Sequence, residues 1–358
     1  MIRTGIVGCG EHSHVHAEAA VRLKELKITA CCDVVEDRAR SWAEKYGCER
    51  YYTELSDMLS EEGLDAVILC TWPGQHLEQI ERCLAAGVKN ILCEKSLTVS
   101  GEEARSILKM ADREKAFIME ACKNRHHPAI RKLEQLLSTG ENGAIDSIRA
   151  TFDNYEPEDG MTPEAQRNWR ERKECGGGVA YDWVSYLVNA CNHFSGGSPR
   201  RVYATGDVSG TYGVINRMHG MIEYDNGIIG YVESSKKSSF SQELQITCGN
   251  ATLRLPVAWG IYGDVVINRQ RRKQEWDYII TDTYEIEHLD AFYLQLKNFA
   301  EVIKGTANPV MPLEQSVMNV QTIDALVTSL MEKRIVLMNL DEVKTQTTTL
   351  PEPDGCPR

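Results

Sequence analysis

The chain has 358 residues, of which 42 % are hydrophobic and 26 % are charged, and its formal net charge is −12. This composition is typical of a folded protein with a sizeable core, and the length favours two domains. No basic stretch opposes the negative charge, and no apolar run approaches the roughly 20 residues of a membrane helix. We therefore expect no nucleic-acid partner and no membrane partner.

Twelve cysteines are spread through the chain without a C-x-x-C pair. Since the first predicted strand begins at the N-terminus, we expect no signal peptide, and we infer reduced thiols in a cytoplasmic protein. His12, His14 and His16 are close in sequence, but no cysteine or acidic residue follows them at a zinc-like spacing. We therefore expect no metal site.

The first predicted strand is followed by a loop that contains Gly8 and Gly10. A helical pattern begins after this glycine loop. Gly8 permits a tight turn, and Gly10 lets a pyrophosphate approach the backbone at the helix start, as in dinucleotide-binding units. Ser13 stands where the G-x-G-x-x-G pattern has its third glycine. The second strand ends at Asp33, 23 residues after Gly10, near the spacing of a carboxylate that binds ribose hydroxyls. A plain strand–helix turn without a nucleotide is the alternative.

Strands and helices alternate through residues 1–121, the predicted nucleotide-binding domain. After Asp33 the pattern predicts a helix at 36–46, a short helix near 53–60, a strand at 65–70, a helix at 77–86, a strand at 90–93, a helix at 101–115 and a strand at 117–120. Five strands in this alternation predict an α/β fold with a doubly wound parallel sheet, the Rossmann arrangement. Gly8, Asp33, Thr71 and Lys95 fall at the carboxyl ends of its strands, where such sheets bind ligands.

Residues 122–340 are the predicted second domain, and residues 341–358 are expected to be a mobile tail. The pattern predicts a helix at 129–138, a strand at 147–155, a helix that opens at Thr162 or Pro163 and carries Trp169 and Arg170, and a helix at 179–194. Beyond Pro199, strands near 201–208, 214–224, 228–234, 242–248, 251–255, 264–268 and 275–280 predict an antiparallel meander. Helices at 289–304 and 313–333 close the domain.

A polar face is predicted on the helix at 179–194, where Asp182, Tyr186 and Asn189 are spaced i, i+4 and i+7. It suits one wall of an active site, and a solvated stripe is the alternative. Three glycines at 176–178 precede this helix. Because such a run is costly in entropy, we expect it to allow close approach of the backbone to a ligand, and a flexible hairpin is the alternative.

Seven segments resemble the glucose–fructose oxidoreductase/inositol dehydrogenase/MocA (Gfo/Idh/MocA) family. They are GIVGCGEHSHVH at 5–16, CCD at 31–33, TWPGQH at 71–76, CEKSLT at 93–98, NRHHP at 124–128, NWR at 168–170 and GGGVAYDWVSYLVNA at 176–190. The resemblance implies an NAD(P)-dependent oxidoreductase acting on a small-molecule sugar, cyclitol or glycoside. It also implies a second α/β domain with a large open, mostly antiparallel sheet, a last helix that packs on the nucleotide domain, and a homo-oligomer, dimer or tetramer, built through that sheet.

The chain departs from the family pattern at three positions. The family's Glu-Lys-Pro is Glu94-Lys95-Ser96 here, the usual catalytic histidine is Tyr186, and the acid that follows it is Asn189. The resemblance implies that Lys95 stabilises the developing alkoxide and that Asp182 holds Lys95. We expect Tyr186 to accept the proton, because a neighbouring ammonium favours phenolate. The alternative is that Tyr186 only packs or binds substrate, while Lys95 or a water passes the proton.

The strand ends and the resemblance together define the expected binding residues. Those expected at the cofactor are Gly8, Gly10, Glu11, His12, Ser13, Asp33, Thr71, Trp72, Pro73, His76, Glu94, Lys95, Lys123, Trp169 and Arg170. Those expected at the substrate are Lys95, Tyr155, Trp169, Asp182, Trp183, Tyr186 and Asn189. We expect NAD in preference to NADP, because Asp33 would bind the ribose and repel a 2′-phosphate, although Arg38 lies near enough to matter.

Three functions fit these residues. The first is oxidation of a secondary hydroxyl to give a keto-sugar. The second is a related NAD-dependent glycosidase or lyase that oxidises C3 transiently and regenerates NAD in each cycle. The third is a redox-inactive NAD-sensing regulatory protein, which the retained Lys95 and Asp182 disfavour and the lost histidine favours. Net NADH formation separates the first function from the second.

Overall fold

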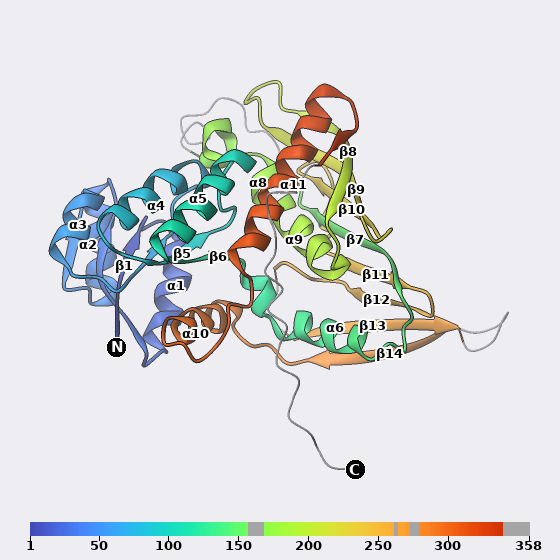
Figure 1. The fold of residues 1–358 in the computed structure, drawn as a ribbon, viewed down its shortest axis with the longest axis horizontal. Coiled ribbons are helices and arrows are strands. Elements are labelled where there is room, and N and C mark those ends of the chain that lie inside the picture. Colours follow the sequence, from blue (N-terminus) through green and yellow to red (C-terminus); the bar gives the residue numbers. More distant parts are fainter. Residues whose placement is uncertain (157–167, 261–263, 273–278, 339–358) are drawn as a thin grey trace, which may run out of the picture.

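The computed structural model describes residues 1–156, 168–260, 264–272 and 279–338, which build two sheets with helices packed on them (Figure 1). The strands of the first sheet are β1 (Ile2–Val7), β2 (Leu26–Cys32), β3 (Arg50–Tyr52), β4 (Ala66–Leu69), β5 (Asn90–Glu94) and β6 (Phe117–Ala121). They are all parallel, in the order β3-β2-β1-β4-β5-β6. This is the doubly wound Rossmann order, so the predicted fold class is confirmed.

The first sheet has six strands, and the prediction of five was wrong. The strands β4 and β5 were found because their apolar runs are buried on both faces, as in a parallel sheet. The missed strand β3 is only three residues long at the sheet edge, and Arg50 and Tyr51 are exposed. An edge strand of this kind carries no hydrophobic run that a sequence pattern could detect.

The helices around the first sheet match the predicted pattern closely. They are α1 (Glu11–Val21), α2 (Glu36–Tyr46), α3 (Leu55–Glu61), η1 (Pro73–Gln75), α4 (His76–Ala85) and α5 (Gly101–Glu114). Helix α2 ends where Gly47 takes a left-handed conformation, with φ +69°. Helix α5 begins where Ser100 Oγ accepts a hydrogen bond from the backbone N–H of Glu103, at 3.2 Å. Both ends follow from local capping chemistry, which explains why the sequence located them.

The second sheet is mostly antiparallel, as predicted. Its strands are β7 (Ile145–Asp153), β8 (Pro199–Val208), β9 (Ile215–Tyr224), β10 (Ile229–Ser235), β11 (Leu244–Cys248), β12 (Ala251–Leu255), β13 (Val265–Arg272), β14 (Ile279–Ile286) and β15 (Val336–Leu337). The simple meander was wrong, because β7 is inserted between β10 and β11 and runs parallel to β10. A strand pattern locates β7 but contains no information about which strands it pairs with.

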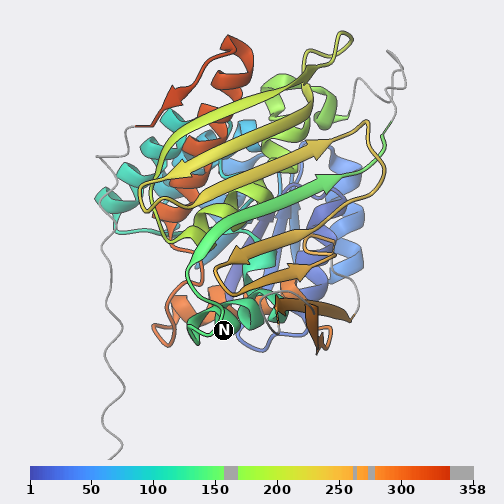
Figure 2. The same ribbon diagram turned by 90° about the vertical axis from the view of Figure 1, so that its right-hand side faces the viewer.

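Most of the remaining helices lie on one face of the second sheet, whose other face is uncovered by the described helices (Figure 2), whereas the helix Ala291–Ile303 packs on α1. The remaining helices are η2 (Lys123–His126), α6 (Pro128–Ser138), η3 (Trp169–Glu171), η4 (Lys173–Cys175), α8 (Val179–Asp182), α9 (Val184–Ser195), α10 (Ala291–Ile303) and α11 (Leu313–Glu332). The predicted single helix at 179–194 was wrong, because it is divided at Trp183. The helix start predicted at Thr162 or Pro163 and the tail at 341–358 lie outside the described residues.

Helix α11 connects the two parts of the molecule (Figure 1). On one side, Asp324 accepts a hydrogen bond from the backbone N–H of Gly101, at the start of α5. On the other, Asn319 accepts a hydrogen bond from Asn192 of α9, at 2.8 Å. The last long helix therefore packs back on the nucleotide domain, as the resemblance implies. No helix in the described ranges is long and apolar enough to cross a membrane.

Gly177 and Gly178 pack closely against the protein's own backbone, and their expected approach to a ligand stays a prediction. Gly176 and Gly178 have φ values of +85° and +81°. A Cβ atom on Gly177 would lie 2.6 Å from the carbonyl oxygen of Arg170. Only glycine fits this close contact, which presses the turn at Trp169–Glu171 against the start of α8. The glycines thus help to place Arg170 beside Asp182.

Candidate active site

The expected residues gather at the carboxyl edge of the first sheet. Gly8, Asp33, Thr71 and Lys95 follow β1, β2, β4 and β5, which are neighbours in the sheet. The edge is completed from the second part of the chain by η3, α8 and the start of α9. Residues about 90 positions apart in the sequence therefore meet here.

The glycine loop has the shape of a phosphate cradle. Gly8 has φ +87°, and a Cβ atom there would lie 3.0 Å from the backbone of Cys70. A Cβ atom on Gly10 would meet no other atom within 4 Å, so the backbone is open on this side, where α1 begins. Ser13 is fully buried, donates to the carbonyl oxygen of Gly10 and accepts a hydrogen bond from Trp42, at 2.8 Å. Its side chain thus closes the loop where the third glycine would stand.

Asp33 lies at the end of β2 and faces the glycine loop. Its carboxylate accepts hydrogen bonds from the backbone N–H groups of Cys9 and Val35, both at 2.9 Å. Arg38, whose side chain is half exposed, is 3.2 Å from one carboxylate oxygen and 3.3 Å from the other. Asp33, the candidate for ribose binding, is therefore held by backbone hydrogen bonds, and the half-exposed Arg38 side chain lies beside it.

The segment from Thr71 to His76 joins two of the strand-end loops. The ring of His76 is buried, with Nε2 3.1 Å from the carbonyl oxygen of Thr71 and Nδ1 3.1 Å from those of Ser96 and Leu97. Burial lowers the pKa of His76. Trp72 and Pro73 lie at the start of η1, in front of His76. The lowered pKa favours the neutral His76 ring, whose single N–H donates to one of these carbonyl groups and supports the backbone behind the site.

Lys95, Asp182, Arg170 and Tyr186 form the centre of the site. Lys95 Nζ is paired with Oδ1 of Asp182 and lies 3.0 Å from its carbonyl oxygen. Arg170 Nε is 2.7 Å from Oδ2 of the same carboxylate. Lys95 Nζ also lies 4.7 Å from the centre of the Tyr186 ring. The expectations that Asp182 holds Lys95 and that Tyr186 is the neighbour of Lys95 agree with this geometry.

Burial and charge set the protonation states of these groups. Burial alone would raise the pKa of Asp182, but Lys95 and Arg170 hold it well below its usual range. Burial would lower the pKa of Lys95, yet Asp182 and then Tyr186 raise it. For Tyr186, burial raises the pKa above its ordinary value, and Lys95 opposes this only in part. Without a bound cofactor, these shifts favour a neutral phenol at Tyr186 and an ammonium at Lys95, and the role of Tyr186 as proton acceptor stays a prediction.

Glu94 connects the helix of the glycine loop to Lys95. Its Oε1 is 2.7 Å from Nε2 of His16 and 3.5 Å from Nε2 of His12, and its Oε2 accepts from the backbone N–H of Lys95. Burial opposes its ionisation, but these histidines and Lys95 lower the pKa of Glu94 to about 2. Lys123 lies close by, with Nζ 4.8 Å from the centre of the Phe292 ring. Glu94 therefore stays an anion and pairs with histidines, while Lys95 pairs with Asp182.

The other residues expected at the substrate are Trp169, Trp183, Tyr155 and Asn189, and they have different surroundings. Arg170 lies over the ring of Trp169, 4.7 Å from its centre, so both border the Asp182 carboxylate. Trp183 is buried and stacks on Phe152, with the ring centres 4.9 Å apart. Tyr155 is 65 % exposed beyond the end of β7. Asn189 is buried and donates to the sulfur of Met311, at 3.1 Å.

Comparisons with known proteins agree with this arrangement. The model of the oxidoreductase family with an NAD-binding Rossmann fold, GFO_IDH_MocA, matches residues 2–122, and the GFO/IDH/MocA C-terminal domain matches residues 130–254. The chain belongs to the Gfo/Idh/MocA family. It is 27 % identical to D-xylose 1-dehydrogenase (NADP(+)) 2 of Haloferax volcanii over 90 % of this chain and 94 % of that protein. It is 23 % identical to myo-inositol 2-dehydrogenase of Thermotoga maritima, over 96 % and 99 %.

Solved structures share the fold of this Gfo/Idh/MocA chain. A 3-ketoreductase from Actinomadura kijaniata, in complex with NADP and TDP-benzene, superposes with a TM-score of 0.82 at 22 % identity, covering 92 % of this chain and 98 % of that one. The family and its named dehydrogenases make this chain an NAD(P)-dependent oxidoreductase that acts on CH–OH groups.

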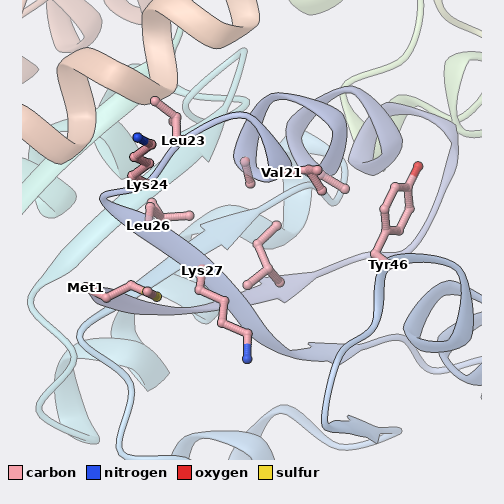
Figure 3. Close-up of a pocket in the computed structure, with 10 residues that line it drawn as sticks. Met1, Val21, Leu23, Lys24, Leu26, Lys27 and Tyr46 are labelled. Carbon is pink, nitrogen blue, oxygen red and sulfur yellow. The ribbon is translucent and has the colours of Figure 1, made fainter.

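A hollow on the first part of this Gfo/Idh/MocA enzyme lies away from the candidate active site (Figure 3). It has a volume of about 340 Å³ and is lined by Met1, Ala17, Ala20, Val21, Leu23, Lys24, Leu26, Lys27, Ile28 and Tyr46. Met1 and Leu26 are at the amino ends of β1 and β2, whereas ligands of such sheets bind at the carboxyl ends. The hollow contains none of the expected site residues.

Two polar residues of the site were missed from the sequence. His16 is four residues after His12, and this helical spacing was the signal that both could reach one acid. Glu120 lies on β6, beside the end of β5, and the rule that function gathers at carboxyl strand ends could have found it. In the described part of the chain, no group of three or more histidines, cysteines or acids is arranged to hold a metal ion.

Proposed function

We propose that this enzyme transfers a hydride between a secondary hydroxyl of a sugar, cyclitol or glycoside and NAD, with the keto-sugar as the oxidised product. The observation that carries the proposal is the cluster of Lys95, Asp182 and Tyr186, at the sheet edge that holds the glycine loop. A redox-inactive sensor would not need an ammonium fixed by a buried carboxylate next to a buried phenol. The xylose and inositol dehydrogenases among the relatives support a polyhydroxylated substrate.

The residues present fit a nicotinamide dinucleotide, whose ring supplies the hydride acceptor or donor. The open backbone at Gly10 and the helix start behind it would hold the pyrophosphate, and Asp33 would hold the adenosine ribose. Glu11, His12, Thr71, Trp72 and Pro73 border the same loops. Lys123, Trp169 and Arg170 would then close the nicotinamide end.

In this site Tyr186 exchanges the proton of the reacting hydroxyl, and Lys95 stabilises the negative oxygen. Asp182 keeps Lys95 in place and leaves it charged, because the carboxylate stays ionised. A buried neutral phenol already holds the proton that carbonyl reduction requires. Oxidation requires phenolate, which a positively charged nicotinamide and rising pH both favour. Reduction is therefore favoured near neutrality and oxidation toward alkaline pH.

We propose that NAD is preferred over NADP, because the Asp33 carboxylate repels a 2′-phosphate. Arg38 weakens this preference, since it pairs with both oxygens of that carboxylate. The relative from Haloferax volcanii is named as an NADP enzyme. We therefore expect measurable activity with NADP as well.

We also propose a cytoplasmic homo-oligomer formed through the uncovered face of the second sheet. On that sheet Tyr203 pairs with Met221, and Met221 pairs with Tyr231 on the next strand. Tyr203 and Met221 are 42 % and 38 % exposed. A row of apolar side chains on neighbouring strands favours burial against another sheet. Sedimentation of the purified enzyme tests this.

A substrate panel tests the proposed reaction. Polyols, aldoses and glycosides are incubated with NAD or NADP, and matching keto-sugars with NADH or NADPH, while reduced cofactor is followed by absorbance. We expect turnover of at least one polyhydroxylated substrate, and none in the Lys95→Met variant. Products without net NADH would favour the glycosidase or lyase alternative. Tight NAD binding without turnover of any compound would favour the sensor.

A further inference from the structure

A buried acid lies behind the loop that carries Lys95. Glu120 is on β6, 4 % exposed, and pairs in register with Cys93 of β5, two residues before Lys95. Its Oε1 accepts a hydrogen bond from the backbone N–H of Leu97, at 2.9 Å. On the other side of the loop, His76 contacts the carbonyl oxygens of Ser96 and Leu97. Two buried side chains therefore hold the backbone that follows Lys95.

A small cavity is lined by both Glu120 and Lys95. It measures about 10 Å³ and is lined by Lys95, Ser96, Glu120, Cys122, Ser185, Asn189, Asn319 and Ile323. Oε2 of Glu120 and Oγ of Ser96 are buried with no hydrogen bond of good geometry among the described residues. A polar cavity of this size holds one water molecule. Such a water can join both atoms and complete their hydrogen bonds.

We propose that Glu120 is a positioning residue for Lys95, which holds the Lys95–Leu97 backbone directly through Leu97 and indirectly through one buried water at Ser96. The inference rests on the proposed function only in that Lys95 is taken to act on the reacting oxygen. In its protonated form, Glu120 accepts from Leu97 with one oxygen and donates to the water with the other. In its ionised form, Glu120 accepts from both Leu97 and the water, so the two forms orient the water differently.

The surroundings of Glu120 move its ionisation toward neutral pH. Burial raises the pKa of Glu120 to about 7, while Ser316 and the N–H of Leu97 oppose this shift. The charged groups nearby are Glu94, which disfavours ionisation, and Lys95, which favours it. The thiols of Cys93 and Cys122 also face it, and the pKa of each is raised by burial and by Glu120. The residues that helices α9 and α11 contribute to this region, Ser185, Asn189, Ser316, Asn319 and Ile323, carry no charge.

Glu120→Gln and Glu120→Met separate positioning from packing. Glutamine can still accept from Leu97 and donate to the water, but it does not titrate, whereas methionine keeps the volume and loses both hydrogen bonds. We expect the wild-type kcat to decrease several-fold as pH rises, with a midpoint near pH 7, in addition to the pH dependence caused by Tyr186. Glu120→Gln should lack this decrease. We expect Glu120→Met to lower kcat at least about tenfold with little change in KM, and to speed hydrogen exchange of the peptide that contains Leu97.

A second measurement needs no substrate. The difference infrared spectrum, wild type minus Glu120→Gln, should contain the band of the protonated Glu120 carboxyl group. This band should disappear as pH rises, with a midpoint near pH 7. Parallel pH profiles of wild type and Glu120→Gln, with near-normal kcat in Glu120→Met, would overturn the inference. If no substrate is turned over, the proposed function fails, and the infrared titration and Leu97 exchange still decide whether Glu120 holds this loop. Absence of both effects would reject the role of Glu120 alone.

Discussion

Two ion pairs lie at the same edge of the first sheet and have opposite surroundings. Asp33 pairs with Arg38, whose side chain is 52 % exposed, while Asp182 pairs with Lys95, whose side chain is 11 % exposed. Both carboxylates are buried, and each has a second set of donors: two backbone N–H groups for Asp33 and Arg170 for Asp182. The difference therefore lies in the cation.

Replacing the exposed cation, Arg38, should cost little free energy, whereas replacing the buried cation, Lys95, should cost more. An exposed pair contributes up to about 1 kcal/mol, whereas breaking a buried pair costs roughly 3–5 kcal/mol because a charge is left without its partner. The cofactor end of the site is thus adjustable, which suits discrimination between NAD and NADP. The reacting end is fixed, which suits a cation that must meet a developing charge.

The largest expected effect is that of Lys95→Met. We expect kcat to fall at least about 100-fold, because removing an aligned cation from the transition state costs on the order of 3 kcal/mol. NAD binding, measured by calorimetry, should survive, since Arg170 still pairs with Asp182. Lys27→Met is the matched control, because Lys27 forms an exposed pair with Glu49 at the opposite edge of the sheet. Near-normal kcat in Lys95→Met would mean that the buried pair is structural.

Tyr186→Phe should lower kcat by at least ~100-fold and abolish the rise in oxidation rate toward alkaline pH. The rise is expected because burial raises the pKa of Tyr186, so phenolate forms only at high pH. Tyr181→Phe is the control, since burial also raises the pKa of Tyr181, which faces Asp324 and Glu103 instead of Lys95. Retained kcat with raised KM would make Tyr186 a binding residue and assign the proton step to Lys95.

Glu120→Gln should change how stability depends on pH. The folded pKa is about 7 and the unfolded value near ~4.3, so the native state binds more protons between these values. The contribution of Glu120 to stability therefore falls as pH rises through this window, by about 4 kcal/mol, and is flat above it. Urea unfolding at both ends of the window should show that Glu120→Gln gains relative to wild type as pH rises. A constant difference would mean that Glu120 does not change its protonation in this range.

The smallest expected effect is that of Arg38→Ala, at the exposed pair. We expect NADP binding to weaken by up to about fivefold, because a half-exposed cation contributes no more than about 1 kcal/mol, while NAD binding changes little. Arg40→Ala is the control, since Arg40 forms a surface pair with Asp37 on the same helix. Calorimetry with both dinucleotides measures the ratio. Equal losses for NAD and NADP would show that Arg38 orders Asp33 and does not contact the phosphate.

The sequence by itself determined the local elements of this protein. The bounds of α2 follow from its helical pattern and from Gly47, and the glycine loop and the acid at the end of β2 follow from their spacing. The alternation of strands and helices then indicated the Rossmann sheet, which in turn placed Gly8, Asp33 and Lys95 at one edge. These features depend on residues close in the chain, where backbone preferences and periodicity act directly.

Only the tertiary structure decided which distant residues meet. It inserted β7 between β10 and β11, divided the helix at Trp183, and stacked Trp183 on Phe152. It also paired Glu94 with His16 and placed Glu120 behind the loop of Lys95. Such partners are chosen by packing and by the need to satisfy buried polar groups, which depend on surfaces that exist only once the chain has folded. The raised pKa of Tyr186 has the same origin, because burial outweighs the neighbouring charge that the sequence suggested.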